Sequence, residues 1–507
     1  MTTKTIRLKN PSEGIKALYQ WIPISLILLT ATALFTYRLG SESLWIDELF
    51  SIRDASLPTL VDVYEGVRQR PLYYLWLHVW MKLGSGDAWL RLPSVISAVV
   101  SVFLLYQLGR RIAGETEGLV AALLMSIAPL FIHHTQEVRM YVMSLGLGLA
   151  GTIFLANALL SPRSQKPSHK VMGSWALFRL LAIYTAPLNL MLLLPDAVLV
   201  LLRFRKERAV LFSFAAWASL VVLLWSPSVL SIAEAAAPTS EFTVSRAQYL
   251  DPPGLNNLVY PLKFWMVPLP IVRTGAAAHI FYRLFTLLVA GIVGAGLICK
   301  HKSPGLLWAS AWFVFPLIPI IVFARISAQI WEPRYVLFVL PYLFILIAAG
   351  FTRLWRQWRI AAVVAAVIYL FGMSWALGDY YTVQNRQDYR FNVETIEQLE
   401  QSGDAIVWGY EWDEPLRYYY HGDAQTYWIS MSDVETPEAI APWLDQLPTG
   451  YERLWVVLED TRPVFKEFKA AIADRYTVDK SFYYKRDSTV MLLTPTSASA
   501  LPASGDR

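Results

Sequence analysis

The chain has 507 residues, of which 55% are apolar and 16% are charged. Soluble domains carry about 25% charged residues, so this composition excludes an ordinary soluble protein and indicates membrane-spanning helices. The formal charge of +5 does not indicate a nucleic-acid partner, because the basic residues cluster in short segments between apolar runs, where they act as topology signals. The single cysteine, Cys299, excludes an intramolecular disulfide framework.

Eleven apolar segments predict an all-α, polytopic membrane domain over residues 1–378. They lie near residues 21–39, 92–109, 119–132, 140–160, 211–230, 280–299, 305–323, 336–352 and 360–377, with two short, broken spans inside 173–202. Pro187 and Pro195 interrupt that last stretch. Every basic cluster, from the polar residues 1–20 onward, falls on one side of the membrane, and the positive-inside rule makes that side cytoplasmic.

Residues 72–83 are apolar but make a run of only about 12 residues. A span needs about 20 residues, so this run predicts a juxtamembrane helix within an outer segment at 41–91. Residues 231–279 form the other long outer segment.

Charged residues return from Asp379 onward, and no later run is long enough to cross a membrane. Strand-like runs alternate there with helix-like stretches, which predicts an α/β domain over 379–507. An odd number of spans places this domain outside the cytoplasm, and its Ser-, Ala- and Pro-rich tail from Thr496 is expected to be disordered. The strand-like runs are 404–408, 426–429, 454–458 and 490–493; the helix-like stretches are 393–401, 435–447 and 463–473.

Two adjacent carboxylates, Asp47 and Glu48, follow the first predicted span. A partly shielded carboxylate suits a general base that takes the proton of an acceptor, whereas a solvated loop acid or a favourable charge at a helix N-terminus is the alternative. Adjacent side chains point about 100° apart on a helix, so both cannot face one reacting atom. The shorter Asp47 suits the base, and Glu48 is expected to bind neighbouring Trp or Arg groups or a metal.

Cations beside aromatic residues are candidates for binding a phosphate and its substrate. A guanidinium near a helix start suits a phosphate, and Arg70 lies directly before Pro71, a favourable first helical residue. Snorkelling to lipid headgroups is the alternative for each of these cations. The candidates in the outer segments are Arg70, Tyr73, Tyr74, Lys263, Arg334 and Tyr335.

The turn between the third and fourth spans carries Glu137, Arg139 and Tyr141. Charges cost about 2.5–3.5 kcal/mol at the centre of a spanning helix, so the turn must lie at a helix end or face a cavity. Glu137 could bind sugar hydroxyls, orient an acceptor or hold a metal; a Glu–Arg pair that caps helix ends is the alternative. The adjacent His133 and His134 are expected to point apart, so neither is assigned as a metal ligand.

Four motifs occur in an order that resembles the multi-span GT-C glycosyltransferases. They are Leu-Trp-Ile-Asp-Glu at 44–48, Arg-Pro-Leu-Tyr-Tyr at 70–74, Leu-Arg-Leu-Pro-Ser at 90–94 and Gln-Glu-Val-Arg-Met-Tyr at 136–141. These glycosyltransferases include protein O-mannosyltransferases, lipid A aminoarabinose transferases and bacterial relatives that use dolichyl- or polyprenyl-phosphate sugars. Residues 40–160 carry most of the resemblance.

The resemblance implies roles for individual residues. The presumed base of the family's first outer loop corresponds to Asp47, the acid of its second loop to Glu137, and the cation before the Pro-Leu-Tyr-Tyr helix to Arg70. Many relatives have Tyr-Thr-His-Tyr in the fifth span, whereas this chain reads Tyr-Thr-Ala-Pro at 184–187. If that His binds donor or acceptor, the substrate of this chain is expected to differ.

The sequence therefore predicts an inverting glycosyltransferase of the plasma (inner) membrane, surrounded by membrane lipids and active at the outer face. The expected donor is a hexosyl or pentosyl group on a polyprenyl phosphate such as undecaprenyl phosphate, and the acceptor is a lipid, glycan or protein. Asp47, Glu48 and Glu137 are the catalytic candidates, and Arg70, Arg139 and Arg334 compensate the leaving phosphate, with or without a divalent metal. A transporter or flippase of lipid-linked sugars is the alternative, since it would use the same cations without a base.

Overall fold

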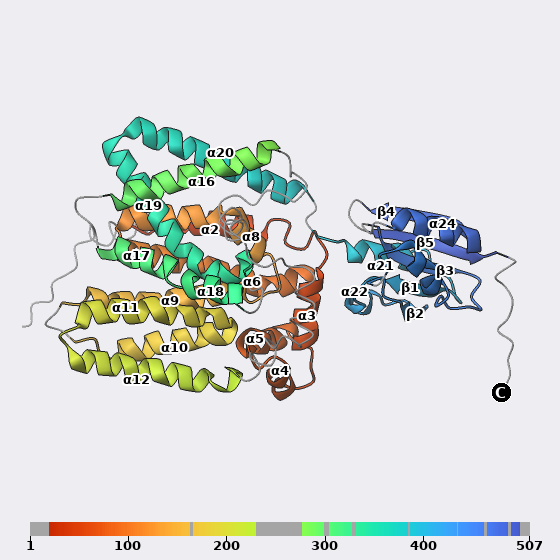
Figure 1. Cartoon of the computed structure of the whole chain (residues 1–507), viewed down its shortest axis with the longest axis horizontal. Helices are drawn as coiled ribbons and strands as arrows, with labels where there is room; N and C mark the ends of the chain where they lie inside the picture. Colours follow the sequence, from red (N-terminus) through yellow and green to blue (C-terminus); the bar gives the residue numbers. More distant parts are fainter. Residues whose placement is uncertain are drawn as a thin grey trace, which may run out of the picture. The chain divides into compact units, whose positions relative to one another are not determined.

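The structure is a computed structural model, and it describes residues 20–162, 166–229, 276–298, 304–326, 331–383, 386–432, 434–460, 464–484 and 488–496 (Figure 1). The chain divides into two compact units. The helical unit comprises residues 1–39, 57–85 and 89–383, and the α/β unit comprises residues 40–56, 86–88 and 384–507.

The helical unit has at least one helix in every apolar segment that the sequence identified. Several of these helices begin at a proline, because the ring fixes φ and the first turn needs no hydrogen-bonded N–H; α5, α8, η1, α17 and η2 start in this way. The helices are α2 (Ile22–Thr36), α4 (Leu60–Gly66), α5 (Pro71–Met81), α6 (Asp87–Ile112), α7 (Glu115–Ser126), α8 (Pro129–Thr135), α9 (Tyr141–Leu160), α10 (His169–Thr185), η1 (Pro187–Leu192), α11 (Leu193–Phe204), α12 (Arg208–Trp225), α16 (Ala276–Leu297), α17 (Pro304–Val314), α18 (Leu317–Ile326), η2 (Pro333–Val339), α19 (Leu340–Gln357) and α20 (Arg359–Thr382).

Eight helical segments of the described chain are long and apolar enough to cross a membrane, and nine if α7 and α8, bent by 63°, make one span. The other two of the eleven predicted spans correspond to α2 and α10, which have 15 and 17 residues. Both are shorter than the roughly 20 residues that cross a hydrocarbon core. At 11 residues, α5 is also too short to cross, as the sequence predicted for this segment. The protein is therefore a multi-pass membrane protein.

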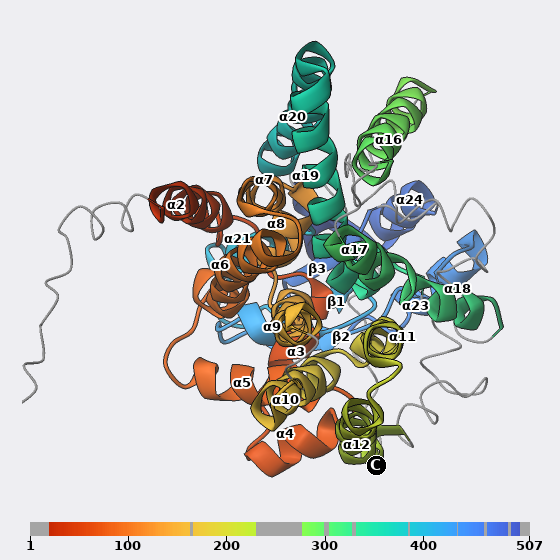
Figure 2. The ribbon, with the colours of Figure 1, turned by 90° about the vertical axis from the view of Figure 1, so that its left-hand side faces the viewer.

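Helices α9 and α19 form the interior of the helical unit. Buried residues make up 78% of the apolar stretch of α9 and 89% of the segment Pro333–Gln357, compared with 22% for α12. In Figure 2, which looks roughly along these helices, α9 lies between α6 on one side and α11 on the other.

A fully buried ion pair joins several of these helices. Arg179 of α10 donates to both carboxylate oxygens of Asp196 of α11, at 2.7 and 3.1 Å. The indole N–H groups of Trp175 and Trp312 donate to the same carboxylate at 2.8 and 2.9 Å. Arg179 also donates to the carbonyl of Gly148 in α9 at 2.6 Å. Because both charges have hydrogen-bond partners, the pair can lie in the apolar interior, and it connects α9, α10, α11 and α17.

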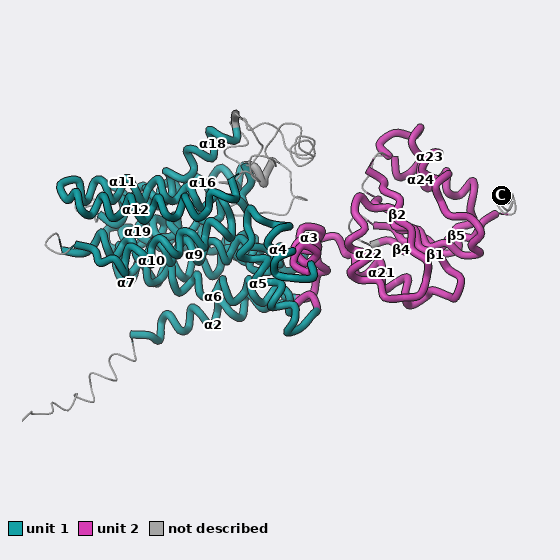
Figure 3. The backbone as a smooth tube through the Cα atoms, turned by 90° about the horizontal axis from the view of Figure 1, so that it is seen from below, with its two compact units in different colours: residues 1–39, 57–85, 89–383 teal, residues 40–56, 86–88, 384–507 magenta. Residues whose placement is uncertain are grey.

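The α/β unit is assembled from segments that lie far apart in the sequence (Figure 3). Its last segment begins at residue 384, close to the predicted boundary at 379, but the unit also takes in residues 40–56, with α3 (Ile46–Ala55), and residues 86–88. Ser43 Oγ donates to the carbonyl of Gln387 at 2.7 Å, and the backbone N–H of Leu44 donates to Tyr419 Oη at 2.7 Å. Sequence composition did not predict this early segment, because composition carries no information on distant partners.

A mixed five-stranded sheet forms the centre of the α/β unit, in the order β2-β1-β3-β5-β4. Strand β1 is parallel to β2 and β3, and β5 is antiparallel to β3 and β4. The four strand-like runs of the sequence correspond to β1, β2, β3 and β5, whereas β4 and α22 were not predicted. The elements are α21 (Tyr389–Glu397), β1 (Ala405–Gly409), α22 (Glu414–Tyr419), β2 (Gln425–Trp428), η3 (Pro437–Ala439), α23 (Ile440–Leu444), β3 (Leu454–Glu459), α24 (Phe465–Arg475), β4 (Tyr476–Tyr484) and β5 (Ser488–Pro495).

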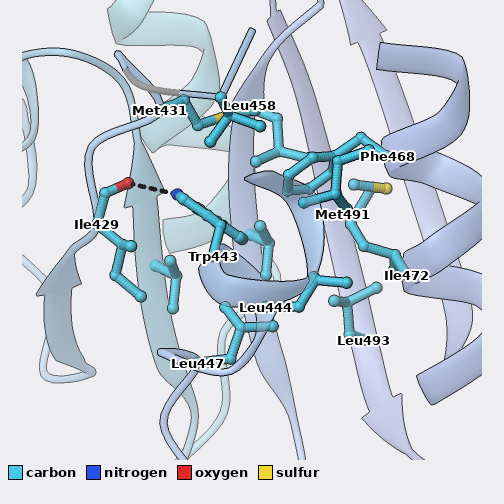
Figure 4. Packing of buried hydrophobic residues seen from close by; sticks show 14 of the residues in the cluster. Ile429, Met431, Trp443, Leu444, Leu447, Leu458, Phe468, Ile472, Met491 and Leu493 are labelled. Atoms are coloured by element: carbon cyan, nitrogen blue, oxygen red, sulfur yellow. Dashed lines mark hydrogen bonds between the residues drawn. The ribbon is translucent and has the colours of Figure 1, made fainter. Parts of the chain in front are cut away.

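One face of this sheet packs against α23 and α24 in an apolar core (Figure 4). Alternate strand residues such as Leu458, Met491 and Leu493 point into it, as the two-residue period of a strand requires. Trp443 of α23 and Phe468 of α24 meet edge to face at 5.0 Å between ring centroids. The α/β unit therefore has an apolar core of its own.

Candidate active site

The predicted site residues divide between the two units. Asp47 and Glu48 belong to the α/β unit, and Lys263 lies outside the described residues. The remaining candidates belong to the helical unit: Arg70, Tyr73, Tyr74, Glu137, Arg139, Tyr141, Arg334 and Tyr335.

A cavity of about 90 Å³ in the helical unit brings four of these candidates together. Arg70 precedes α5, Tyr141 begins α9, and Arg334 and Tyr335 lie in the first turn of η2. Residues 186–188, where α10 ends and η1 begins, also line the cavity, as do apolar residues of η2. Interruptions of helices at prolines therefore create the cavity and place its two guanidinium groups.

Aromatic rings hold the guanidinium groups near this cavity. The Arg70 guanidinium lies 5.5 Å from the ring centre of Tyr74, and the Arg334 guanidinium lies 5.3 Å from that of Tyr335. Tyr73 and Tyr74 are buried and pack edge to face at 5.6 Å. Since a ring face attracts a cation, these contacts favour guanidinium positions beside the cavity before any anion binds.

Arg139 does not line the cavity but contacts a residue that does. Its Nη2 donates to Tyr141 Oη at 3.2 Å, and its guanidinium lies 5.5 Å from the same ring. The rings of Tyr141 and Tyr335 lie 6.2 Å apart. Arg139 therefore adds positive charge next to the wall and fixes the orientation of Tyr141.

Glu137 binds two histidines, which corrects the expectation that His133 and His134 point apart. His133 Nε2 lies 3.1 Å from Oε1 of Glu137, and His134 Nδ1 lies 2.8 Å from its Oε2. Glu137 follows His133 by four residues and His134 by three, just beyond the end of α8. At these spacings two side chains can lie on the same face of a helical turn, so each oxygen of the Glu137 carboxylate contacts one ring. The sequence argument considered only the angle between adjacent side chains and so missed the shared partner.

The Glu137 carboxylate is 1% exposed. Burial raises its pKa, but the imidazoles of His134 and His133 outweigh burial and hold the pKa well below its usual range. Glu137 is therefore a buried anion at neutral pH, and its histidine partners fix its position.

The same three side chains could hold a divalent cation. One ligand atom from each of His133, His134 and Glu137 lies within 4.8 Å of the others. Two imidazoles and one carboxylate are the protein ligands of a typical open zinc site, in which water or substrate completes the coordination. His133 is partly exposed, which would leave a side of the cluster accessible.

Two polar residues position the turn that carries Glu137. Gln136 Nε2 donates to the carbonyls of Phe35 and Tyr37 at 2.9 Å each, and its Oε1 accepts from Tyr380 Oη at 2.8 Å. Ser94 of α6 donates to the carbonyl of Glu137 at 2.6 Å. Both residues lie in the motifs that the sequence singled out, yet their roles depend on residues far away in the chain.

The adjacent acids of the α/β unit have different surroundings. Glu48 is 0% exposed, and its Oε2 accepts from Arg386 Nη1 at 2.9 Å and from the backbone N–H of Trp45 at 3.2 Å. Asp47, in the first turn of α3, is partly exposed. Glu48 therefore binds neighbouring Trp and Arg groups, as the sequence led us to expect for the second acid of the pair.

Comparison with known families gives one match. Residues 69–231 match the family model described as dolichyl-phosphate-mannose-protein mannosyltransferase. The matched range contains Arg70, Glu137, Arg139 and Tyr141, together with both histidines. A comparison with curated proteins found no match.

Several solved structures have a similar fold. ArnT from Cupriavidus metallidurans bound to undecaprenyl phosphate is 16% identical with a TM-score of 0.55, over 94% of this chain and 99% of that chain. AglB from Archaeoglobus fulgidus, in complex with an inhibitory peptide and a dolichol-phosphate, is 9% identical with a TM-score of 0.53, over 96% and 75%. The oligosaccharyltransferase of the same organism in complex with Zn and sulfate is 10% identical with a TM-score of 0.51, over 92% and 72%. The fold is thus that of the GT-C glycosyltransferases.

Proposed function

We propose that this GT-C protein transfers a monosaccharide from a polyprenyl-phosphate carrier to a lipid, glycan or protein acceptor. The observation that carries the proposal is the cavity that Arg70 and Arg334 line together with apolar residues. The carrier joins an anionic phosphate to an apolar polyprenyl chain. Guanidinium groups can bind the phosphate, and apolar side chains can contact the polyprenyl chain. Two proteins of this fold, ArnT and AglB, bind undecaprenyl phosphate and dolichol-phosphate.

In the proposed reaction Asp47 takes the proton of the acceptor hydroxyl or amine. The acceptor atom attacks the anomeric carbon on the face opposite the phosphate, and the bond between that carbon and the phosphate oxygen breaks. The sugar is transferred with inversion, and the carrier leaves as polyprenyl phosphate. Arg70, Arg139 and Arg334 offset the negative charge that grows on the leaving phosphate.

A divalent metal fits this proposal without being required by it. His133, His134 and Glu137 would hold the ion, which when bound would supply further positive charge to offset an anionic group. Without an ion, His133 and His134 keep Glu137 in place, close to Arg139 and Tyr141 in the chain.

We also propose that the reaction takes place at the outer face of the plasma (inner) membrane. The positive-inside rule puts the basic clusters of the sequence in the cytoplasm. Arg70, Glu137 and Arg334 then belong to segments on the opposite side, where a carrier-linked sugar would be presented to the cell envelope.

The proposal is tested by measuring the binding of undecaprenyl phosphate to the purified full-length protein in nanodiscs. We expect Arg70→Ala and Arg334→Ala each to weaken binding by about 1.5–3 kcal/mol, the scale of a charge-assisted hydrogen bond. Arg68→Ala is the matched control, because Arg68 lies two residues away in the chain, is largely exposed and pairs with Glu65 at 3.3 Å. Equal affinity of the wild-type protein and both cavity variants would refute this assignment of the carrier phosphate.

A further inference from the structure

A second pocket, of about 470 Å³, lies in the α/β unit between α22 and the edge strand β2. Its volume falls within the roughly 300–1,000 Å³ that small-molecule sites occupy. The side chains that form it are mostly aromatic or polar. They include Asp413, Arg417, Tyr420, Thr426, Tyr427 and Trp428.

The aromatic rings of this pocket are fixed by their polar groups. Tyr420 Oη donates to Glu400 at 2.7 Å, Tyr427 Oη bonds Tyr451 Oη at 2.7 Å, and the indole N–H of Trp428 donates to a carbonyl at 3.0 Å. Each ring therefore uses its polar atom within the protein, and the ring of Tyr427 also packs against the apolar core. Trp428 is 49% exposed, so part of its ring surface is open to a ligand.

A carboxylate and a guanidinium complete the pocket. Arg417 Nε donates to Asp413 Oδ2 at 2.6 Å. The Arg417 side chain is 76% exposed, whereas Asp413 is 17% exposed, so the guanidinium keeps most of its donors toward solvent while the acid holds its orientation. Thr426 adds a hydroxyl on the edge strand. The pocket thus offers donors and acceptors around flat apolar surfaces.

We propose that this pocket binds a saccharide. The C–H groups on one face of a sugar ring are apolar and can lie flat on Trp428, while the ring hydroxyls pair with a carboxylate, a guanidinium or a hydroxyl. A lipid would need a more apolar wall, and a free phosphate would not need exposed rings. The inference rests on the proposed function in one respect only, namely that the bound saccharide is the glycan part of a glycosylated acceptor.

The test uses the full-length protein in nanodiscs, because sugar-headed detergents would compete for the pocket. A fluorescent sample is applied to an array of bacterial oligosaccharides, and the affinity for the best binder is then measured. We expect Trp428→Ala to lower that affinity at least tenfold and Arg417→Ala at least threefold. Trp428→Phe, which keeps an aromatic face, should retain most of the binding.

Trp412→Ala is the matched control, since Trp412 is 43% exposed in the same unit but is not part of the pocket. Its affinity should stay within twofold of the wild-type value. An array on which no oligosaccharide binds, or equal losses in Trp428→Ala and Trp412→Ala, would overturn the proposal. Asp47→Asn should bind the same oligosaccharide with wild-type affinity, because Asp47 does not line this pocket. Loss of sugar transfer in that variant therefore tests the proposed function, and loss of oligosaccharide binding in Trp428→Ala tests the proposed saccharide site.

Discussion

Asp47 and Glu48 show how far neighbouring residues can differ in role. Both carry the same charge in the first turn of α3, yet Glu48 is buried against Arg386 and Asp47 is partly exposed. The sequence predicted the divergence, because adjacent residues of a helix point about 100° apart. It could not predict the partner of Glu48, which lies 338 residues later.

The proposed base predicts a difference between two isosteric variants. Asp47→Asn should lower kcat at least about 100-fold, within the range of general-base contributions, with normal protein levels and normal binding of the carrier. Turnover is measured with a polyprenyl-phosphate sugar and nanodisc-embedded protein. A transporter or flippase would not need the base, so full activity of Asp47→Asn would remove this mechanism.

Glu48→Gln serves as the comparison for that experiment. It weakens a buried ion pair, so we expect a loss of about 1–3 kcal/mol of stability, seen as a lower thermal midpoint, and a smaller effect on kcat of the folded fraction. If Glu48→Gln lowered kcat as much as Asp47→Asn did without a change in stability, Glu48 would share the chemistry.

The cluster of His133, His134 and Glu137 predicts a measurable metal content. Protein purified without chelator and then equilibrated with Zn²⁺ should retain close to one equivalent by elemental analysis, and Glu137→Gln should retain far less, because the variant loses the anionic ligand. His169→Ala is the control, since His169 starts α10, away from the cluster. Equal zinc content in wild-type and Glu137→Gln protein would show that these residues hold no metal.

At the scale of elements, removing one partner of the buried pair Arg179–Asp196 should strongly destabilise the helical unit. Asp196→Ala leaves the Arg179 charge without its buried partner, so we expect a loss of about 3–5 kcal/mol, measured as a fall in the thermal midpoint of the purified protein. Glu65→Ala removes an exposed pair with Arg68 and should change stability by about 1 kcal/mol or less. Similar midpoints for the two variants would contradict the assignment.

The elements that sequence analysis predicted share a clear local signal. Long apolar runs marked the helices, and short apolar runs marked β1, β2, β3 and β5. Strand β4 was missed because it lies at the sheet edge and carries Asp479 and Lys480 among its aromatic residues. Helix α22 has six residues, too few for a helical period to be visible. Charges beside apolar runs marked Arg70, Glu137 and Arg334 as candidates. The contacts of His133 and His134 with Glu137 are local, at spacings of four and three residues, and could have been predicted had that spacing been considered.

At the scale of the whole molecule, the count of spans predicts where the α/β unit lies. If all eleven segments that the sequence predicts cross the membrane and the chain starts in the cytoplasm, a reporter fused after Thr382 should be active outside the cytoplasm. A fusion after Arg205, which lies in a basic cluster at the end of α11, is the control and should behave as cytoplasmic. Cytoplasmic activity of the reporter after Thr382 would mean an even number of crossings.

The discontinuous α/β unit also has a consequence for the order of events during synthesis. Glu48 leaves the ribosome 338 residues before Arg386, an interval of roughly 20–70 s at about 5–20 residues per second. Throughout that time Glu48 has its local partner, the backbone N–H of Trp45, but not Arg386, so the buried ion pair forms only after most of the chain has been made. A chain that stops before residue 386 would therefore leave Glu48 without its buried cation.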